Sequence, residues 1–131
     1  QIKSEQTHEP YSLLFINIDH FRMLNDKQGH QVGDEALKVL ADTLRDNSRN
    51  VDFASRLGGD EFVLLLPQTD KQTCELLGSR IARAAEKKFN QHGWGIALSY
   101  GHITEIGQGR SVGELLRAAN ENMELNKQSK E

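Results

Sequence analysis

The order in which strand-like and helix-like segments follow one another most constrains the fold of this chain. Residues 11–18 (YSLLFINI) form a compact apolar run bounded by Pro10, which predicts a buried strand. Apolar side chains recur at helical spacing from Val32 to Leu44, which predicts a helix of roughly 14 residues. The same criteria predict strands at 51–57 and 61–66, a helix at 70–88, a strand at 94–99 that continues over 101–106, and a last helix at 112–127.

This order of strand, helix, hairpin, helix and strand predicts the split βαβ, ferredoxin-like arrangement. We therefore expect an α/β (α+β) fold with a central antiparallel sheet flanked by helices. In this topology the first and third strands are antiparallel neighbours, so the end of one lies beside the start of the other. The first strand ends in Asn17-Ile18-Asp19, and the third begins after the turn Gly58-Gly59-Asp60.

Acidic oxygens should therefore converge beside a glycine turn. The two-residue period of a strand places Asn17 and Asp19 on one face, and Asp60 and Glu61 lie at the neighbouring strand end. Such oxygens suit Mg²⁺, which usually bridges substrate phosphates and can support phosphoryl transfer. Turn chemistry alone also accounts for a Gly-Gly-Asp hairpin, and solvated acids are common at strand ends. The convergence therefore indicates a cation site without identifying a substrate.

The net charge and the cysteine content limit the expected partners and the cellular compartment of the protein. The net charge of −3 argues against a nucleic-acid polymer as partner, but it is compatible with a small phosphorylated ligand. One cysteine permits no internal disulfide, which favours a reducing compartment such as the cytoplasm. No apolar run is long enough to span a bilayer. We expect residues 1–131 to be one domain of a longer multidomain protein, because the chain begins at Gln1, with sensory or membrane-anchoring domains upstream.

Two motifs resemble those of the diguanylate cyclases. Residues 58–62 read GGDEF, and residues 17–37 (NIDHFRMLNDKQGHQVGDEAL) resemble the family's D-x-D-x-F-K…N-D…G-H…G-D block. The resemblance runs from about residue 11 to residue 127 and implies a palm-type, nucleotide-cyclase-like fold. It also implies an enzyme that condenses two GTP into cyclic di-GMP with Mg²⁺ or Mn²⁺ and releases pyrophosphate. A homodimer is implied because each 3′-hydroxyl attacks the α-phosphate held by the other subunit.

The resemblance assigns roles to residues at the catalytic site. Asp60 and Glu61 would be metal-binding and catalytic carboxylates, and Asn17 and the Ile18 carbonyl would complete the metal site. Lys127 matches the family's phosphate-binding lysine. Further positions match substrate-binding residues: Asn25 and Asp34 as the guanine-reading pair, Gly58 and Gly59 as the turn beside the nucleotide, and Arg22 in place of the usual lysine.

A second, inhibitory site is also implied. Arg49-Asn50-Val51-Asp52 resembles the RxxD motif that binds cyclic di-GMP in this family, and Arg80 falls where a secondary inhibitory arginine lies. Arginine forks suit phosphate oxygens and guanine edges. The alternative is that Arg49 and Asp52 form a surface ion pair, which would contribute little to stability.

Two departures from the family pattern bear on activity. Asn17 stands where the family usually has a metal-binding aspartate, and Glu131 stands where an arginine often assists the phosphate-binding lysine. An amide keeps an oxygen but lacks the negative charge, so we expect reduced activity. The alternative is a catalytically degenerate domain that binds GTP or cyclic di-GMP as a sensor. A more distant alternative is a ferredoxin-like interaction domain without a nucleotide site.

Overall fold

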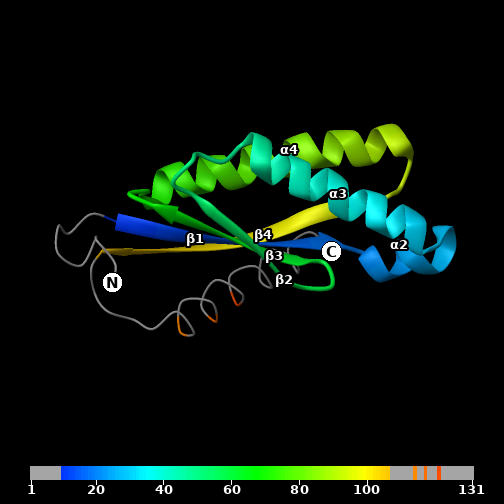
Figure 1. Cartoon of the computed structure of the whole chain (residues 1–131), viewed down its shortest axis with the longest axis horizontal. Coiled ribbons are helices and arrows are strands. Elements are labelled where there is room, and N and C mark those ends of the chain that lie inside the picture. The colour runs from blue at the N-terminus through cyan, green and yellow to red at the C-terminus, as the bar shows by residue number, and fades with distance from the viewer. Residues whose placement is uncertain (1–9, 107–113, 115–116, 118–120, 122–131) are drawn as a thin grey trace.

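The computed structural model describes residues 10–106 together with residues 114, 117 and 121. The elements follow in the order β1 (Pro10–Asp19), α2 (Phe21–Gln28), α3 (His30–Asp46), β2 (Phe53–Gly58), β3 (Glu61–Pro67), α4 (Lys71–His92) and β4 (Ala97–Ile106). The four strands form one sheet in the order β2-β3-β1-β4, and α3 and α4 lie across one face of it (Figure 1). This is the predicted antiparallel α/β architecture.

The central strand β1 is antiparallel to both of its neighbours. It pairs with β3 from Tyr11↔Pro67 to Asn17↔Glu61, and with β4 along its whole length. Its side chains from Tyr11 to Asp19 are buried on both faces of the sheet. This double burial explains why the segment reads as a continuous apolar run rather than as an alternating pattern.

The main core lies between the sheet and the two long helices. Leu14, Ile16 and Ile18 of β1 point into it together with Leu40 of α3 and Phe89 of α4, all of them fully or almost fully buried. Asp70 caps the N-terminus of helix α4, and its carboxylate accepts a hydrogen bond from the Thr73 backbone N–H at 2.8 Å. Hydrogen bonding from the backbone, and also from the side chain, of Thr73 lowers the pKa of the Asp70 carboxyl. No helix in the described part of the chain is long and apolar enough to cross a membrane.

The structure corrects several predicted boundaries. Helix α2 was not predicted, because it has eight residues and buries only Leu24, too little for a periodic pattern. The strand predicted at 94–99 does continue over 101–106, but it starts at Ala97, since Gly93 and Gly95 have positive φ and hold Trp94 in a connecting segment. Helix α4 continues to His92, beyond the predicted end at residue 88. The predicted helix at 112–127 lies almost entirely outside the described residues.

Candidate functional site

The ends of β1 and β3 meet as the topology predicts. Asn17 is directly opposite Glu61, and the Ile18 backbone N–H donates to the Asp60 carbonyl at 3.3 Å. Directly paired residues point to the same face of a sheet, so the Asn17 and Glu61 side chains share one face. Ile18 points to the opposite face, into the core under the helices. The end of β1 thus presents Asn17 on one face of the sheet, while Ile18 on the other face anchors the strand in the core.

Asn17 contacts the candidate metal-binding aspartate. Its Nδ2 donates a hydrogen bond to Asp60 Oδ2 at 3.1 Å, while its Oδ1 is buried and has no hydrogen-bond partner among the described residues. A buried oxygen without a partner is destabilising, by about 1–3 kcal/mol. A cation would satisfy this oxygen, and the surrounding donors are hard oxygen ligands of the kind that Mg²⁺ prefers.

The strand end nonetheless offers few acidic ligands. No group of three or more His, Cys, Asp or Glu side chains in the described part of the chain is placed to hold a metal ion. Asp60 and Glu61 are the carboxylates that the end of β3 brings to Asn17, so a metal here would also depend on the Asn17 amide oxygen and on a backbone carbonyl such as that of Ile18. The residues fit a hard cation that keeps water or phosphate oxygens among its ligands.

Asp19 has a different environment from the other residues at this strand end. It is 5% exposed, and Ser99 Oγ of β4 lies 2.8 Å from each of its carboxylate oxygens. It does share a face with Asn17, as predicted, because the two residues are two positions apart in one strand. The carboxylate of Asp19 therefore fastens β1 to β4 directly ahead of α2.

The turn between β2 and β3 leaves open space beside the strand ends. Gly59 has a φ of +41°, in the left-handed region that favours glycine, and a Cβ at Gly58 or Gly59 would meet no heavy atom of the described residues within 4 Å. Arg56 was not predicted as a site residue, and its Nε and terminal nitrogen donate to the Gly59 carbonyl at 2.9 and 2.6 Å. Arg56 thereby stabilises the turn from the β2 side. Its position two residues ahead of the glycines was the sequence feature from which this role could have been predicted.

The guanine-reading candidates lie on two consecutive helices. Asn25 is half-buried on α2, and Asp34 is exposed just after the first turn of α3. The Asn25 Oδ1 is buried and has no hydrogen-bond partner among the described residues. Arg22 is exposed in the first turn of α2, on the same connection from the end of β1. Lys127 and Glu131 lie outside the described residues.

The two RxxD residues form a tighter pair than an ordinary surface ion pair. Arg49 donates to both carboxylate oxygens of Asp52, the shortest of these contacts being 2.7 Å, and these hydrogen bonds raise the pKa of Arg49. The Asp52 side chain is 1% exposed, whereas that of Arg49 is 50% exposed. Arg49 also donates to the Pro67 carbonyl at 2.8 Å and to Thr69 Oγ1 at 2.9 Å. Arg49 therefore fastens the turn before β2 to the end of β3.

Arg80 of α4 joins this pair across a cavity of about 230 Å³. Arg80 is exposed, and one turn earlier Leu76 lines the same cavity with 66% of its surface exposed. The structure thus brings together the three residues that sequence analysis assigned to an inhibitory site. The guanidinium groups of Arg49 and Arg80 offer positive charge to a ligand, and Leu76 offers an apolar surface.

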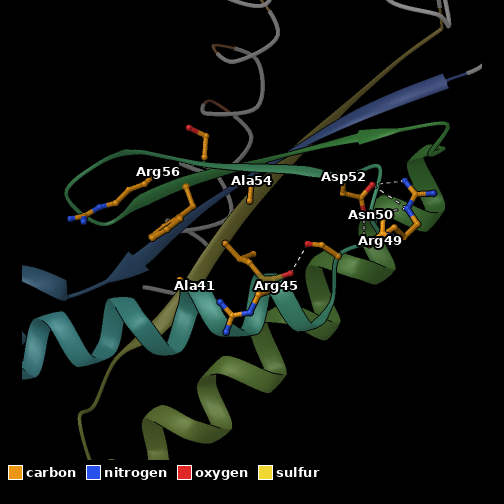
Figure 2. Close-up of a pocket in the computed structure, with 11 residues that line it drawn as sticks. Ala41, Arg45, Arg49, Asn50, Asp52, Ala54 and Arg56 are labelled. Atoms are coloured by element: carbon orange, nitrogen blue, oxygen red, sulfur yellow. Dashed lines mark hydrogen bonds and ion pairs between the residues drawn. The ribbon is translucent and has the colours of Figure 1, made fainter.

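A larger cavity of about 420 Å³ lies on the other side of the RxxD turn, between α3 and β2 (Figure 2). Figure 2 shows α3, which carries Arg45, across the cavity from Ala54 of β2, with Arg49 and Asp52 hydrogen-bonded at one end. Arg56 lies at the opposite end, toward the glycine turn. The RxxD turn therefore separates two cavities.

Comparisons with known proteins agree with this arrangement. The family model described as "Diguanylate cyclase, GGDEF domain" matches residues 1–131. Diguanylate cyclase DosC of Escherichia coli K12 is 34% identical over 102 residues, which are 75% of this chain and 22% of DosC. Diguanylate cyclase DgcS of Shewanella oneidensis is 40% identical over 90 residues, 69% of this chain and 30% of DgcS. The chain thus spans less than a third of either relative.

A solved structure shares the fold over nearly the whole chain. The active GGEEF domain of a diguanylate cyclase from Vibrio cholerae superimposes with a TM-score of 0.84 at 26% sequence identity. The superposition covers 97% of this chain and 82% of that one.

Proposed function

The chain belongs to the family of diguanylate cyclases with a GGDEF domain, and from that premise we propose that it condenses two molecules of GTP into cyclic di-GMP and releases pyrophosphate. The observation that carries the proposal is the contact between Asn17 and Asp60 at the strand ends, with a buried Asn17 oxygen that has no hydrogen-bond partner in the described part of the chain. Open space around Gly58 and Gly59 next to this contact would admit a nucleotide. A simple structural hairpin has no need of either feature.

We assign the metal site to Asn17, Asp60, Glu61 and the backbone carbonyl of Ile18. Mg²⁺ or Mn²⁺ bound there would neutralise phosphate charge and increase the acidity of the attacking hydroxyl. Asn17 contributes a neutral oxygen instead of a carboxylate, so the site has one negative charge fewer than the family pattern provides. We therefore propose an enzyme of reduced activity.

The remaining substrate contacts follow from the helices beside the strand ends. The Asp34 carboxylate would accept hydrogen bonds from guanine N1–H and the 2-amino group, which adenine does not offer, and the Asn25 amide would add a second polar contact. Arg22 would approach the phosphates from the start of α2, and Lys127 would do so from outside the described residues. Arg56 would keep the Gly59 carbonyl in place while the nucleotide lies along the turn.

The reaction requires two subunits in this proposal. Each subunit would hold one GTP, and each 3′-hydroxyl would attack the α-phosphate held by the other subunit. Pyrophosphate would leave at each attack. A monomer would hold only half of the reacting groups, so the rate should rise with dimerisation. The supply of GTP and the single cysteine favour the cytoplasm as the compartment, with upstream domains providing the signal.

Product inhibition would act at the cavity formed by Arg49, Asp52 and Arg80. Guanidinium groups bind phosphate and the guanine edge with paired hydrogen bonds, and Leu76 would provide an apolar contact for a base. Arg49 is already engaged by Asp52, Pro67 and Thr69, so Arg80 is the cation more available to a ligand. A bound cyclic di-GMP would lie at the end of β3 opposite to the catalytic turn.

The second candidate function is that of a sensor that binds GTP or cyclic di-GMP without turnover. Asn17 favours it, because the neutral amide weakens the metal site. The variant Asp60→Ala in the full-length protein separates the two functions. Loss of one preorganised electrostatic group commonly lowers a rate by about 10²–10³-fold, so an enzyme should lose measurable synthesis while its melting temperature stays near that of the wild type. Wild-type protein that binds GTP but forms no product would establish the sensor instead.

A further inference from the structure

The junction between α2 and α3 holds the Asn25 carboxamide in an unusual position. The two helices are separated by Gly29, whose N–H donates to the Asn25 carbonyl at 2.9 Å, and α2 lies at one end of the molecule (Figure 1). One turn into α3, Gly33 is buried and lies under the Asn25 side chain. The junction therefore contains two glycines with different surroundings.

Gly29 and Gly33 are glycines for different physical reasons. Gly29 has a φ of +93°, which side chains disfavour, and a Cβ there would meet nothing within 4 Å. Gly33 lies inside α3 without a positive φ, but an ideal Cβ would lie 1.7 Å from Asn25 Oδ1 and 2.8 Å from Asn25 Cγ. The three heavy atoms nearest to that Cβ all belong to Asn25. The Asn25 side chain thus requires a glycine at position 33, whereas the backbone conformation there does not.

Packing, rather than hydrogen bonding, fixes this side of the Asn25 carboxamide. Its Oδ1 is buried and has no hydrogen-bond partner among the described residues, so no donor there would hold the amide in place if its packing changed. A glycine within a helix is also less favourable than alanine by about 1 kcal/mol. This buried Asn25 oxygen and the glycine within the helix each lower the stability of the fold. Their combination points to a functional role for the position of the Asn25 amide.

We infer that Gly33 is a positioning residue for guanine selectivity, because its missing Cβ allows the Asn25 carboxamide to lie against the residue that directly precedes Asp34. The inference rests on the proposed function, in which Asn25 and Asp34 bind the guanine base. Asp34 follows Gly33 directly, just after the first turn of α3, so both members of the pair depend on this part of the helix. A methyl group at position 33 would force the Asn25 amide away from its place while leaving Asp34 in the helix.

A double-mutant cycle of melting temperatures tests the contact. Gly33→Ala should lower the melting temperature by about 5 °C or more, since the new Cβ overlaps with the Asn25 amide. In an Asn25→Ala background the same change should leave the melting temperature unchanged or raise it, because the clash is gone and alanine favours the helix. An equal fall in both backgrounds would overturn the inference.

Nucleotide binding tests selectivity in the same four proteins. Affinities for GTP and ATP in the presence of Mg²⁺ should show that Gly33→Ala weakens GTP binding by about tenfold, as Asn25→Ala does, without a further loss in the double variant. ATP affinity should not change, and Lys38→Ala, an exposed change on the same helix, should leave both affinities at the wild-type level.

Two outcomes separate failure of the inference from failure of the proposed function. Wild-type selectivity for GTP that persists in a folded Gly33→Ala protein would overturn the inference alone. Wild-type protein that shows no preference for GTP over ATP would overturn the proposed function and the inference together.

Discussion

Replacing Asn17 by aspartate gives the sharpest test of the proposed metal site. Asn17 Nδ2 donates to Asp60 Oδ2 at 3.1 Å, and both groups lie at the paired ends of β1 and β3. An aspartate at position 17 cannot donate this hydrogen bond when ionised, so two carboxylates would face each other. Without a cation the variant should be less stable, and with a cation it should bind the metal more tightly than the wild type.

The magnitude follows from the lost contact and the new charge. A hydrogen bond to a charged acceptor contributes about 1.5–3 kcal/mol, and two like charges about 4 Å apart repel by about 4 kcal/mol at an effective dielectric of 20. Rotation of the side chains relieves part of the repulsion, so we expect a loss of about 2–4 kcal/mol in EDTA. This corresponds to a fall of about 10 °C in the melting temperature.

Magnesium should reverse this effect in Asn17→Asp and have little effect on the wild type. Scanning calorimetry in EDTA and in excess Mg²⁺ measures the stability, and initial rates against metal concentration measure activity. The added charge should raise the rate by roughly tenfold or more, because each 1.4 kcal/mol is a factor of ten. Mn²⁺ should support the wild type better than Mg²⁺, since it tolerates weaker and less regular ligand sets.

Asn17→Ala is the matched control, because it removes the same hydrogen bond without adding a charge. It should be destabilised in both buffers and should gain no activity from Mg²⁺. An Asn17→Asp protein that is as stable as the wild type in EDTA, does not respond to Mg²⁺ and shows the wild-type rate would refute the reasoning. The buried oxygen of Asn17 would then have no connection with a metal.

Three further predictions concern residues outside the metal site. Arg80→Ala should weaken cyclic di-GMP binding by about ten- to a hundredfold at an unchanged melting temperature. Arg49→Ala should lower both the affinity and the melting temperature, since Arg49 also donates hydrogen bonds to Pro67 and Thr69. Calorimetry measures both quantities, and unchanged affinities in both variants would leave only a structural ion pair. Ser99→Ala should destabilise the protein by about 1.5–3 kcal/mol in denaturant titrations, because the buried Asp19 carboxylate loses the Ser99 hydroxyl; wild-type stability would show that the hydrogen bond is dispensable. The lowered pKa of Asp70 stabilises the fold above the ordinary pKa of an aspartate, and this contribution is lost as the pH falls through the lower value in the folded state. Asp70→Asn keeps an N-cap acceptor and should flatten this acidic dependence of the melting temperature, and identical pH profiles would contradict the assignment.

The topology was predictable because it depends on the order and period of apolar segments. Once β1 and β3 are known to be antiparallel neighbours, the meeting of Asn17 with Asp60 and Glu61 follows from the chain alone. The hydrogen bonds between Ser99 and Asp19 could not be predicted, because 80 positions separate these residues and the pairing depends on the register of β4.

Short-range packing accounts for the other features that sequence analysis missed. Helix α2 buries a single large side chain, Leu24, so no apolar period revealed it. The overlap between a Cβ at Gly33 and the Asn25 amide depends on the angle between two helices, which no sequence pattern encodes. The hydrogen bond from Arg56 to Gly59 likewise requires the actual shape of the hairpin. The sequence therefore predicted which strand ends meet, and the structure identified the contacts that shape this region.

The conversion of GTP by the wild-type full-length protein tests the central claim most directly. The protein would be incubated with GTP and either Mg²⁺ or Mn²⁺ at concentrations that favour dimers, and the nucleotides and pyrophosphate would be separated and counted. The proposed function predicts one cyclic di-GMP and two pyrophosphates for every two GTP consumed, at a rate that increases with dimerisation. GTP that is bound but remains unconverted with both metals, in the wild type and in Asn17→Asp alike, would contradict it.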